Sequence, residues 1–289
     1  MVDYQPLDAA FAGLLAEQAA VPGGMLLAQT VATTAVRRRL LPIIPLRAGW
    51  RVLDLGTGFG PLAFELAATA TVEVVGIDTD EDVLVAASAL GVKLQGRLAP
   101  GSTVRFEPGD AEALEVAPAS FDLAVARLLF QHLANPAGAA RGIARALRPG
   151  GYAFVFDVDD GLGATYPRLG GPLEILEDAF DAWQSSYGGD RQIGRKLSSL
   201  LASAGLSVEA VAVVPEAEHR REGPGDPSRA LAVARLRAAR DGIAAAGILT
   251  ADELDRLVEA YLASPPLERC RIESQVAVIA RRPLAATEV

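Results

Sequence analysis

Short runs of aliphatic and β-branched residues alternate with stretches of mixed polarity through the middle of the chain. The apolar runs predict strands over 51–55, 72–77, 104–107, 121–126 and 152–158. The stretches between them predict helices over 61–70, 81–89 and 137–147. Because strands that alternate with helices form right-handed βαβ units, this pattern predicts a parallel, doubly wound α/β sheet.

The last third of the chain has a different pattern. It predicts a helix over 193–204, a sixth strand over 207–214, a polar, turn-rich segment over 215–227, helices over 228–246 and 251–262, and a last strand over 272–280. Thr250, with Glu253 three residues later, predicts a capping box at the start of the last helix. We therefore expect an N-terminal helical cap over 1–46 and an α/β domain over 47–289, with a helical insertion at about 215–271.

Composition narrows the class of protein. The chain has 289 residues, 51% of them hydrophobic, which is enough for one large α/β domain with a real core. A net charge of −9 argues against a nucleic-acid partner, and the arginine runs over 37–39 and 229–240 are expected to be solvated helix faces.

The remaining compositional features concern compartment and membrane. Cys270 is the single cysteine, so no intramolecular disulfide or cysteine-based zinc site can form, which fits a reduced cytoplasmic location. No apolar run approaches the roughly 20 residues of a membrane helix, and the N-terminus lacks the pattern of a secretory signal. We therefore expect a cytoplasmic protein without a membrane partner.

A glycine-rich turn follows the first predicted strand. Asp54, Gly56, Gly58 and Gly60 are spaced D-x-G-x-G-x-G. Glycines let the backbone turn sharply and approach a ligand, and the next helix presents free N–H groups. A dinucleotide fingerprint, G-x-G-x-x-G, would need its third glycine at position 61, which is Pro61. The spacing therefore disfavours NAD, and the remaining alternative is a glycine turn without a ligand.

Further motifs follow the next strands. The second strand ends in Asp78-Thr79, the third is followed by Asp110-Ala111, the fourth runs into a Phe-Asp…His-Leu segment over 121–133, and a Leu-Arg-Pro-Gly-Gly turn lies at 147–151. As a set over 51–158, these residues resemble the class I S-adenosylmethionine-dependent methyltransferases, particularly the ubiquinone/menaquinone-type and natural-product small-molecule enzymes. The resemblance implies a Rossmann-like, seven-stranded, mostly parallel sheet with an antiparallel last strand, N-terminal helices and a helical lid before that strand.

The resemblance also implies a cofactor site for S-adenosylmethionine. Asp78 would bind the ribose, although an NAD enzyme also has an acid there. Asp110 would face the adenine, with an Asx turn or helix N-cap as its structural alternative. Arg127 would meet the methionine carboxylate or a substrate anion, with a surface ion pair as the alternative. The complete set expected to bind the cofactor is Asp54, Gly56, Thr57, Gly58, Gly60, Asp78, Thr79, Asp110, Ala111 and Arg127.

His132 is the candidate catalytic residue. It follows the fourth strand, where a general base would meet the acceptor. The alternative, which we favour, is a packing histidine, because this family commonly has histidine here without a chemical role. Asp157, Asp159 and Asp160 lie where catechol methyltransferases bind magnesium, but those enzymes need an aspartate where this chain has Arg127, so we expect no metal.

These features predict a methyltransferase that acts on a small organic molecule, with the acceptor atom left open. The N-terminal helices, the segment 161–195 and the insertion 215–271 are expected to cover the substrate, and the insertion is either a lid or a homodimer surface. The alternatives are an NAD(P)-dependent oxidoreductase and a cofactor-binding relative without methyl transfer, such as a cyclisation catalyst.

Overall fold

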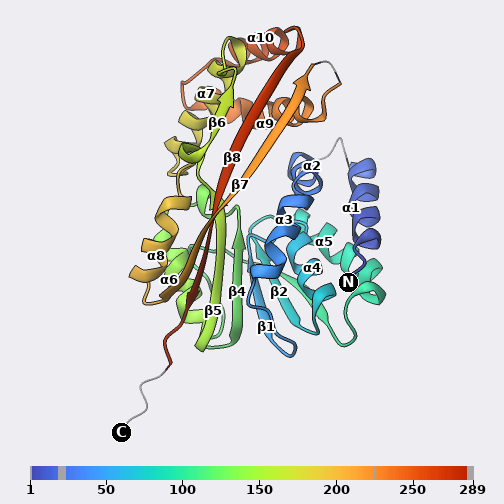
Figure 1. Ribbon diagram of the computed structural model, residues 1–289, viewed down its shortest axis with the longest axis vertical. Helices are drawn as coiled ribbons and strands as arrows, with labels where there is room; N and C mark the ends of the chain where they lie inside the picture. The colour runs from blue at the N-terminus through green and yellow to red at the C-terminus, as the bar shows by residue number, and fades with distance from the viewer. Residues whose placement is uncertain (1, 19–23, 224, 285–289) are drawn as a thin grey trace.

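One central sheet organises the molecule. The computed structural model describes residues 2–18, 24–223 and 225–284, and in these residues eight strands form a sheet of order β3-β2-β1-β4-β5-β8-β6, with β7 paired to β8 (Figure 1). The parallel strands are β1 (Arg51–Leu55), β2 (Glu73–Asp78), β3 (Thr103–Pro108), β4 (Phe121–Arg127) and β5 (Leu147–Val158). β8 (Leu267–Arg281) is antiparallel to β5. The predicted mostly parallel Rossmann-like sheet with an antiparallel last strand is confirmed.

Helices cover both faces of this sheet, because alternate strand residues are apolar on both sides. Val52 and Val74 pack towards α1 (Gln5–Gln18), α2 (Gly24–Ala32), α3 (Thr34–Leu40), α4 (Pro61–Thr69) and α5 (Glu81–Leu94). Leu53 and Val75 pack on the opposite face, towards α6 (Pro136–Ala146) and α8 (Leu197–Ser203). Burial on both faces is what holds a parallel sheet together. No helix in the described ranges combines the length and the apolar character required to cross a bilayer.

A long antiparallel ribbon extends the sheet beyond its core. β7 (Ser207–Glu222) pairs with β8 from Ser207 opposite Arg281 to Glu222 opposite Leu267. β6 (Ala164–Tyr166) pairs with β8 from its other side and is an eighth strand that the sequence did not predict. The prediction of a turn-rich segment over 215–227 was wrong for 215–222, which is strand.

The ribbon carries a second, smaller helical layer. α7 (Pro172–Ser186), α9 (Pro227–Ala245) and α10 (Ala251–Leu262) pack around their own apolar cluster, which includes Leu176, Leu236 and Leu254. In Figure 1 this layer, which we call the cap, lies at the far end of the ribbon from the C-terminal end of β8. The expected helical insertion over 215–271 is therefore helical only between Pro227 and Leu262, and its two ends are strands.

The N-terminal helices are fastened to the core by buried charge. Their predicted span, 1–46, includes residues 1 and 19–23, which lie outside the described residues. Arg37 is 2% exposed, and its guanidinium donates to both carboxylate oxygens of Glu65 in α4, at 2.7 and 3.0 Å. Arg38 also reaches Glu65, at 3.0 Å. The expectation of a solvated face was wrong for Arg37, because a run of arginines does not show which member has a carboxylate partner.

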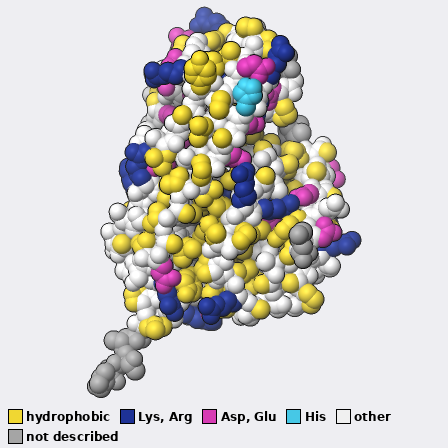
Figure 2. Space-filling model, viewed as in Figure 1, with side chains coloured by type: hydrophobic (Ala, Val, Ile, Leu, Met, Phe, Trp, Pro, Cys, Tyr) yellow, Lys and Arg dark blue, Asp and Glu magenta, His cyan; other side chains and the backbone are white. Residues whose placement is uncertain are grey.

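The second arginine run is also partly buried. Arg229 is 5% exposed and donates to the carbonyl oxygen of Tyr261 at 2.7 Å, near the end of α10. Arg235 pairs with Glu177 of α7, and Arg240 pairs with Asp255 of α10. These arginines join the three cap helices, so the solvated-face interpretation was wrong for them, whereas Arg237 of the same run is exposed as expected. On the face shown in Figure 2, basic side chains are interspersed with acidic and apolar ones.

Candidate cofactor and acceptor site

The glycine loop lies at the C-terminal edge of the sheet, between β1 and α4. Gly56, Gly58 and Gly60 have φ angles of 65°, 53° and 75°, which disfavour other residues. A Cβ atom at Gly60 would lie 2.4 Å from the Phe106 ring. The N–H groups of Gly56 and Thr57 both donate to the carbonyl oxygen of Ile77, at 2.9 and 3.1 Å. The loop is therefore held against β2, with Pro61 in the first turn of α4.

Asp54 supports this loop from inside. Its side chain is 2% exposed and accepts a hydrogen bond of 2.7 Å from the Thr57 hydroxyl. Burial raises the pKa of the Asp54 carboxyl to about 7, although the Thr57 hydrogen bond acts in the opposite direction. The predicted pair Asp54 and Thr57 is thus in direct contact, and its contacts shape the loop.

Asp78 meets the same loop from the end of β2. One carboxylate oxygen accepts the N–H of Gly58 at 2.8 Å, and the other accepts the N–H of Asp80 at 3.2 Å. The Gly109 N–H donates to the carbonyl oxygen of Asp78 at 3.0 Å, so the chain after β3 is joined to this edge. Thr79 is exposed beside Asp78. The carboxylate therefore lies at the loop.

Asp110 forms an Asx turn, which is one of the structural alternatives expected from the sequence. Its Oδ1 atom accepts the Glu112 N–H at 2.8 Å in an Asx turn, and Ala111 beside it is buried. The turn places the exposed Asp110 next along the sheet edge from Asp78. An Asx turn uses one oxygen of the carboxylate, so this geometry is compatible with a second partner.

Arg127 ends β4 on the same edge. Its Nε and Nη2 atoms are buried and have no hydrogen-bond partner among the described residues, which also give it no ion pair. Burial and the nearby Arg37 lower the pKa of Arg127 to about 10, so the guanidinium stays charged near neutral pH. The alternative of a surface ion pair is wrong. A buried, charged group without a partner is costly, which indicates a site for an anion.

His132 lies in a short 3-10 turn, η3 (Phe130–His132), after β4. Its side chain retains accessible area, yet desolvation by the surrounding protein, aided by Arg191, lowers its pKa to about 4. The imidazole is therefore neutral near pH 7.

Gln131, the residue before His132, joins four parts of the molecule. Its N–H donates to Asp157 at 3.2 Å, and its side-chain oxygen accepts from Arg191 at 2.6 Å. Its carbonyl oxygen accepts from the Gln184 side chain and from the Asp190 N–H, each at 2.8 Å. The turn that carries His132 is thus fixed to β5 and to the end of α7. No pattern in the sequence marks Gln131 or Gln184 as a functional residue.

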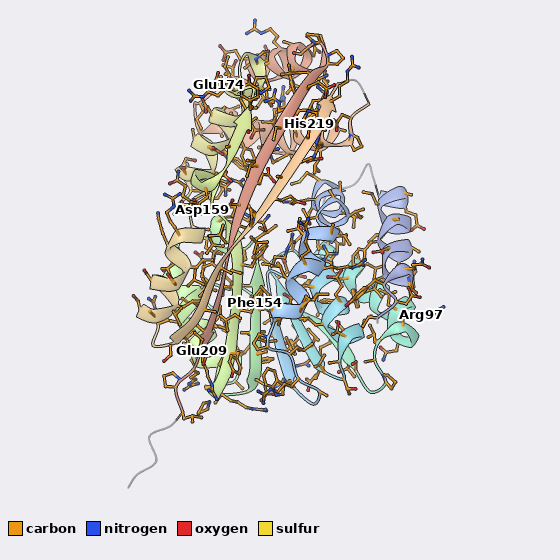
Figure 3. All side chains as sticks on the ribbon, viewed as in Figure 1. Arg97, Phe154, Asp159, Glu174, Glu209 and His219 are labelled. Carbon is orange, nitrogen blue, oxygen red and sulfur yellow. The ribbon has the colours of Figure 1, made fainter. Side chains whose placement is uncertain are left out.

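The three acids at the end of β5 each have protein partners. Asp157 is fully buried and accepts N–H groups from Gln131 and Val158, and burial raises its pKa to about 7. Asp159 pairs with Arg195 at 2.5 Å, at the level where the ribbon leaves the core in Figure 3. Asp160 pairs with both nitrogens of the Arg191 fork, at 2.7 and 3.0 Å. These carboxylates therefore stabilise the junction between core and cap.

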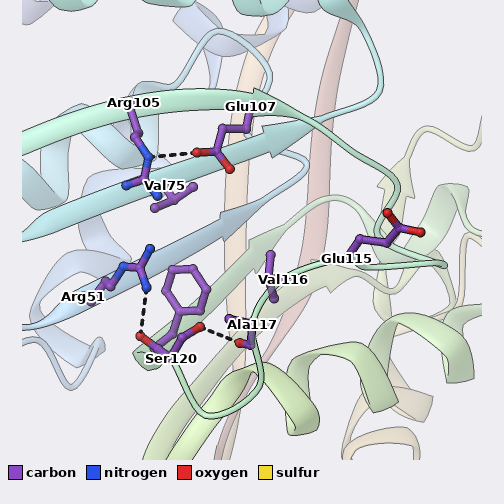
Figure 4. Close-up of a pocket in the computed structure, with 9 residues that line it drawn as sticks. Arg51, Val75, Arg105, Glu107, Glu115, Val116, Ala117 and Ser120 are labelled. Carbon is purple, nitrogen blue, oxygen red and sulfur yellow. Dashed lines mark hydrogen bonds and ion pairs between the residues drawn. The ribbon is translucent and has the colours of Figure 1, made fainter.

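A separate pocket lies at the other ends of the strands. It has a volume of about 190 Å³ and is lined by Arg51 and Phe121, the first residues of β1 and β4, together with charged residues of β3 (Figure 4). Arg105 and Glu107 pair with each other across its wall at 2.8 Å. Because it is at the N-terminal ends of β1 and β4, this pocket is distinct from the glycine-loop edge.

Comparison with known proteins identifies the family. A family model described as a methyltransferase domain matches residues 53–155. The chain is 30% identical over 163 residues to ubiquinone/menaquinone biosynthesis C-methyltransferase UbiE of Bdellovibrio bacteriovorus, a match that covers 52% of this chain and 67% of that enzyme. The chain belongs to the class I S-adenosylmethionine-dependent methyltransferase family. The predicted membership is confirmed, and S-adenosylmethionine is the cofactor of that family.

Two further relatives show how far the likeness reaches. The chain is 38% identical over 120 residues to 27-O-demethylrifamycin SV methyltransferase of Amycolatopsis mediterranei, covering 42% of this chain and only 43% of that enzyme. The solved structure of the [4+2]-cyclase SpnF has a TM-score of 0.55 at 19% identity and covers 98% of this chain and 94% of the cyclase. The cyclase shows the shared fold alone, and an NAD(P)-dependent oxidoreductase is not favoured by these methyltransferase matches.

Proposed function

We propose that this family member transfers a methyl group from S-adenosylmethionine to a small organic molecule by in-line displacement, without a metal ion. The observation that carries the proposal is the Arg127 guanidinium, whose Nε and Nη2 atoms have no partner among the described residues. It lies on the sheet edge that also bears the glycine loop and Asp78. A cofactor with a carboxylate at one end and ribose hydroxyls in its middle has chemistry that fits these groups.

In this proposal, each residue of the sheet edge binds a different part of the cofactor. Arg127 binds the methionine carboxylate through charge-assisted hydrogen bonds. Asp78 accepts hydrogen bonds from the ribose hydroxyls, and Asp110 with the Ala111 N–H binds the adenine edge. Gly56, Gly58 and Gly60 leave room for close approach of the backbone, and Asp54, Thr57 and Thr79 support the loop and its neighbour. When bound, the cofactor supplies a methyl group already activated by its positive sulfur.

The protein's remaining task is to position the acceptor and exclude water. His132 lies on the acceptor side of β4, and the end of α7 packs against its turn through Gln184 and Gln131. The cap is then a cover for a small substrate. The metal-free proposal rests on the acids after β5, since Asp159 and Asp160 are already paired with Arg195 and Arg191.

The test begins with calorimetric titration of S-adenosylmethionine, S-adenosylhomocysteine and NAD⁺ into the protein. We expect micromolar-range binding of the first two and none of NAD⁺. Arg127→Gln should weaken S-adenosylmethionine binding about 10- to 100-fold, because a buried charge-assisted hydrogen bond is lost. Binding of 5′-methylthioadenosine, which lacks the amino-acid end, should change little.

Two controls define the outcome. Arg105→Gln removes an arginine from the far pocket and should leave all affinities unchanged. Equal losses for S-adenosylmethionine and methylthioadenosine in Arg127→Gln would contradict the carboxylate role. Because the fold is shared with a cyclase, release of S-adenosylhomocysteine in the presence of a small-molecule extract is also required. Its absence despite cofactor binding would favour the alternative without methyl transfer, and loss of activity in excess chelator would contradict the metal-free proposal.

A further inference from the structure

The turn that follows β4 contains a residue in an unfavourable backbone conformation. Leu128 has a φ angle of 55°, a region that residues other than glycine rarely adopt. Its N–H donates to the carbonyl oxygen of Phe156 at 2.9 Å, and its own carbonyl oxygen accepts from the Gln131 Nε2 atom at 3.4 Å. Such a conformation persists only where the surrounding structure holds it. Leu128 is therefore held from two sides, by β5 and by the Gln131 side chain.

The residues on either side of Leu128 belong to the cofactor edge. Arg127, which precedes it, is the residue proposed to bind the methionine carboxylate. Leu129, which follows it, packs on the glycine loop, since a Cβ atom at Gly56 would lie 2.8 Å from the Leu129 Cδ1 atom. A change in the backbone of Leu128 would therefore displace both the guanidinium and the side chain against which the glycine loop rests.

Gln131 also joins this turn to the cap. Its carbonyl oxygen accepts from the Gln184 side chain and from the Asp190 N–H, each at 2.8 Å, and its Oε1 atom accepts from Arg191 at 2.6 Å. A guanidinium only donates, so this last bond fixes the orientation of the amide and leaves its Nε2 atom for the Leu128 carbonyl. Gln131 is 2% exposed, so bulk water does not replace a lost partner. One buried glutamine thus connects the end of α7 with the cofactor edge.

We propose that Gln131 is a positioning residue that couples the docking of α7 to the binding of S-adenosylmethionine. This inference goes beyond the proposed function but rests on it, because the cofactor must bind at the glycine-loop edge. When α7 is docked, Gln131 holds Leu128, and with it Arg127 and Leu129, in the arrangement that receives the methionine end. Coupling between two sites is reciprocal, so the bound cofactor also strengthens the docking of α7 on the turn.

The first experiment weakens the coupling from the cap side. Gln184→Met removes the side-chain donor to the Gln131 carbonyl at nearly equal volume and leaves every proposed cofactor-binding residue in place. Calorimetric titration should show that the affinity for S-adenosylhomocysteine falls at least about fivefold. Gln192→Met is the matched control, because it removes an exposed glutamine from the segment after α7, and it should bind as the wild type does.

The second experiment needs no variant. Hydrogen exchange of the wild type, followed by mass spectrometry, should be slower in the peptide 187–193 when S-adenosylhomocysteine is added, because the Asp190 N–H donates to Gln131. The peptide 251–262 of α10 is the internal reference for a general stabilisation by the ligand, and its exchange should change less.

Three results would count against these proposals. A folded Gln184→Met variant with unchanged affinity, even one with a lower free energy of unfolding, would overturn the coupling and leave Gln184 a purely structural role. Equal changes of exchange in 187–193 and 251–262 would also overturn it. Failure of S-adenosylhomocysteine to bind the wild type would instead overturn the proposed function, and the inference with it.

Discussion

At the scale of single residues, His132 shows how position changes chemistry. A histidine of ordinary pKa would be a well-matched base near pH 7, but desolvation and Arg191 lower the pKa of His132 to about 4. The imidazole is therefore neutral and can accept a hydrogen bond, yet its low basicity makes it a weak proton acceptor. The low pKa therefore disfavours general-base catalysis by this exposed side chain.

We predict that His132→Ala lowers turnover by less than about tenfold at saturating cofactor, since a general base typically contributes 10²–10⁴. The pH profile of kcat/KM for the wild type should show no limb from this histidine between pH 6 and 8, because its proton is already lost below that range. His219→Ala, at the other histidine, which is exposed on β7, is the control. A loss of turnover above a hundredfold in His132→Ala, but not in His219→Ala, would show that His132 acts as a general base.

The geometry of the glycine loop could be predicted from the sequence, but the contacts that hold the turn before His132 could not. Asp54 and Thr57 are three residues apart, and the glycine spacing reports a backbone shape directly. Gln184 and Gln131 are 53 residues apart, and only the docking of α7 onto η3 brings them together. Polar residues whose partners are set by tertiary packing carry no periodic signal along the chain.

At the scale of elements, the β7–β8 ribbon explains the main error in the predicted boundaries. The segment 215–222 is polar and begins with Pro215, which disfavours a central strand. β7, however, lies at an edge, where a missing N–H can face away from the ladder, and Pro215 stands opposite Ser274 in register. Charged residues are tolerated there because one side of the ribbon remains solvated, as at His219 and Glu268, whose side chains are 69% and 60% exposed.

The start of α10 is an element that the sequence predicted correctly. The Thr250 hydroxyl accepts the Glu253 N–H at 3.3 Å, and the Glu253 carboxylate accepts the Thr250 N–H at 2.9 Å, so the capping box is confirmed. Thr250→Ala should lower the free energy of unfolding by about 1 kcal/mol, since one N–H of the first turn loses its partner. Urea denaturation measures this change.

Thr250→Ser is the matched control, because it keeps the hydroxyl, and it should lie within about 0.5 kcal/mol of the wild type. If Thr250→Ala had the same free energy of unfolding as the wild type, the capping box would contribute nothing measurable to stability. Packing against α7 and α9 would then hold α10 alone.

At the scale of the whole molecule, buried charge joins the N-terminal helices to the cofactor domain. Arg37 of α3 and Glu65 of α4 are both almost fully buried, with side chains 2% exposed, and Arg127 lies close enough for its charge to respond to both. The helix α3 is therefore packed against the charges beneath the glycine-loop edge. If this helix shifted away from α4, Arg37 would lose Glu65 and its charge would be uncompensated next to Arg127.

Glu65→Gln should lower the free energy of unfolding by about 3 kcal/mol, because removing one partner of a buried pair leaves the other charge unpaired. Glu216→Gln breaks the neighbouring Arg39–Glu216 pair, whose side chains are 54% and 35% exposed, and should cost less than about 1 kcal/mol. Urea denaturation of both variants compares a buried with a surface pair in the same run of arginines.

Equal losses of stability would mean that, without Glu65, Arg37 is hydrated or finds another partner. A larger loss for Glu65→Gln, relieved by the double variant Arg37→Met with Glu65→Leu, would show that the unpaired charge is the cause, since an apolar pair leaves nothing to compensate.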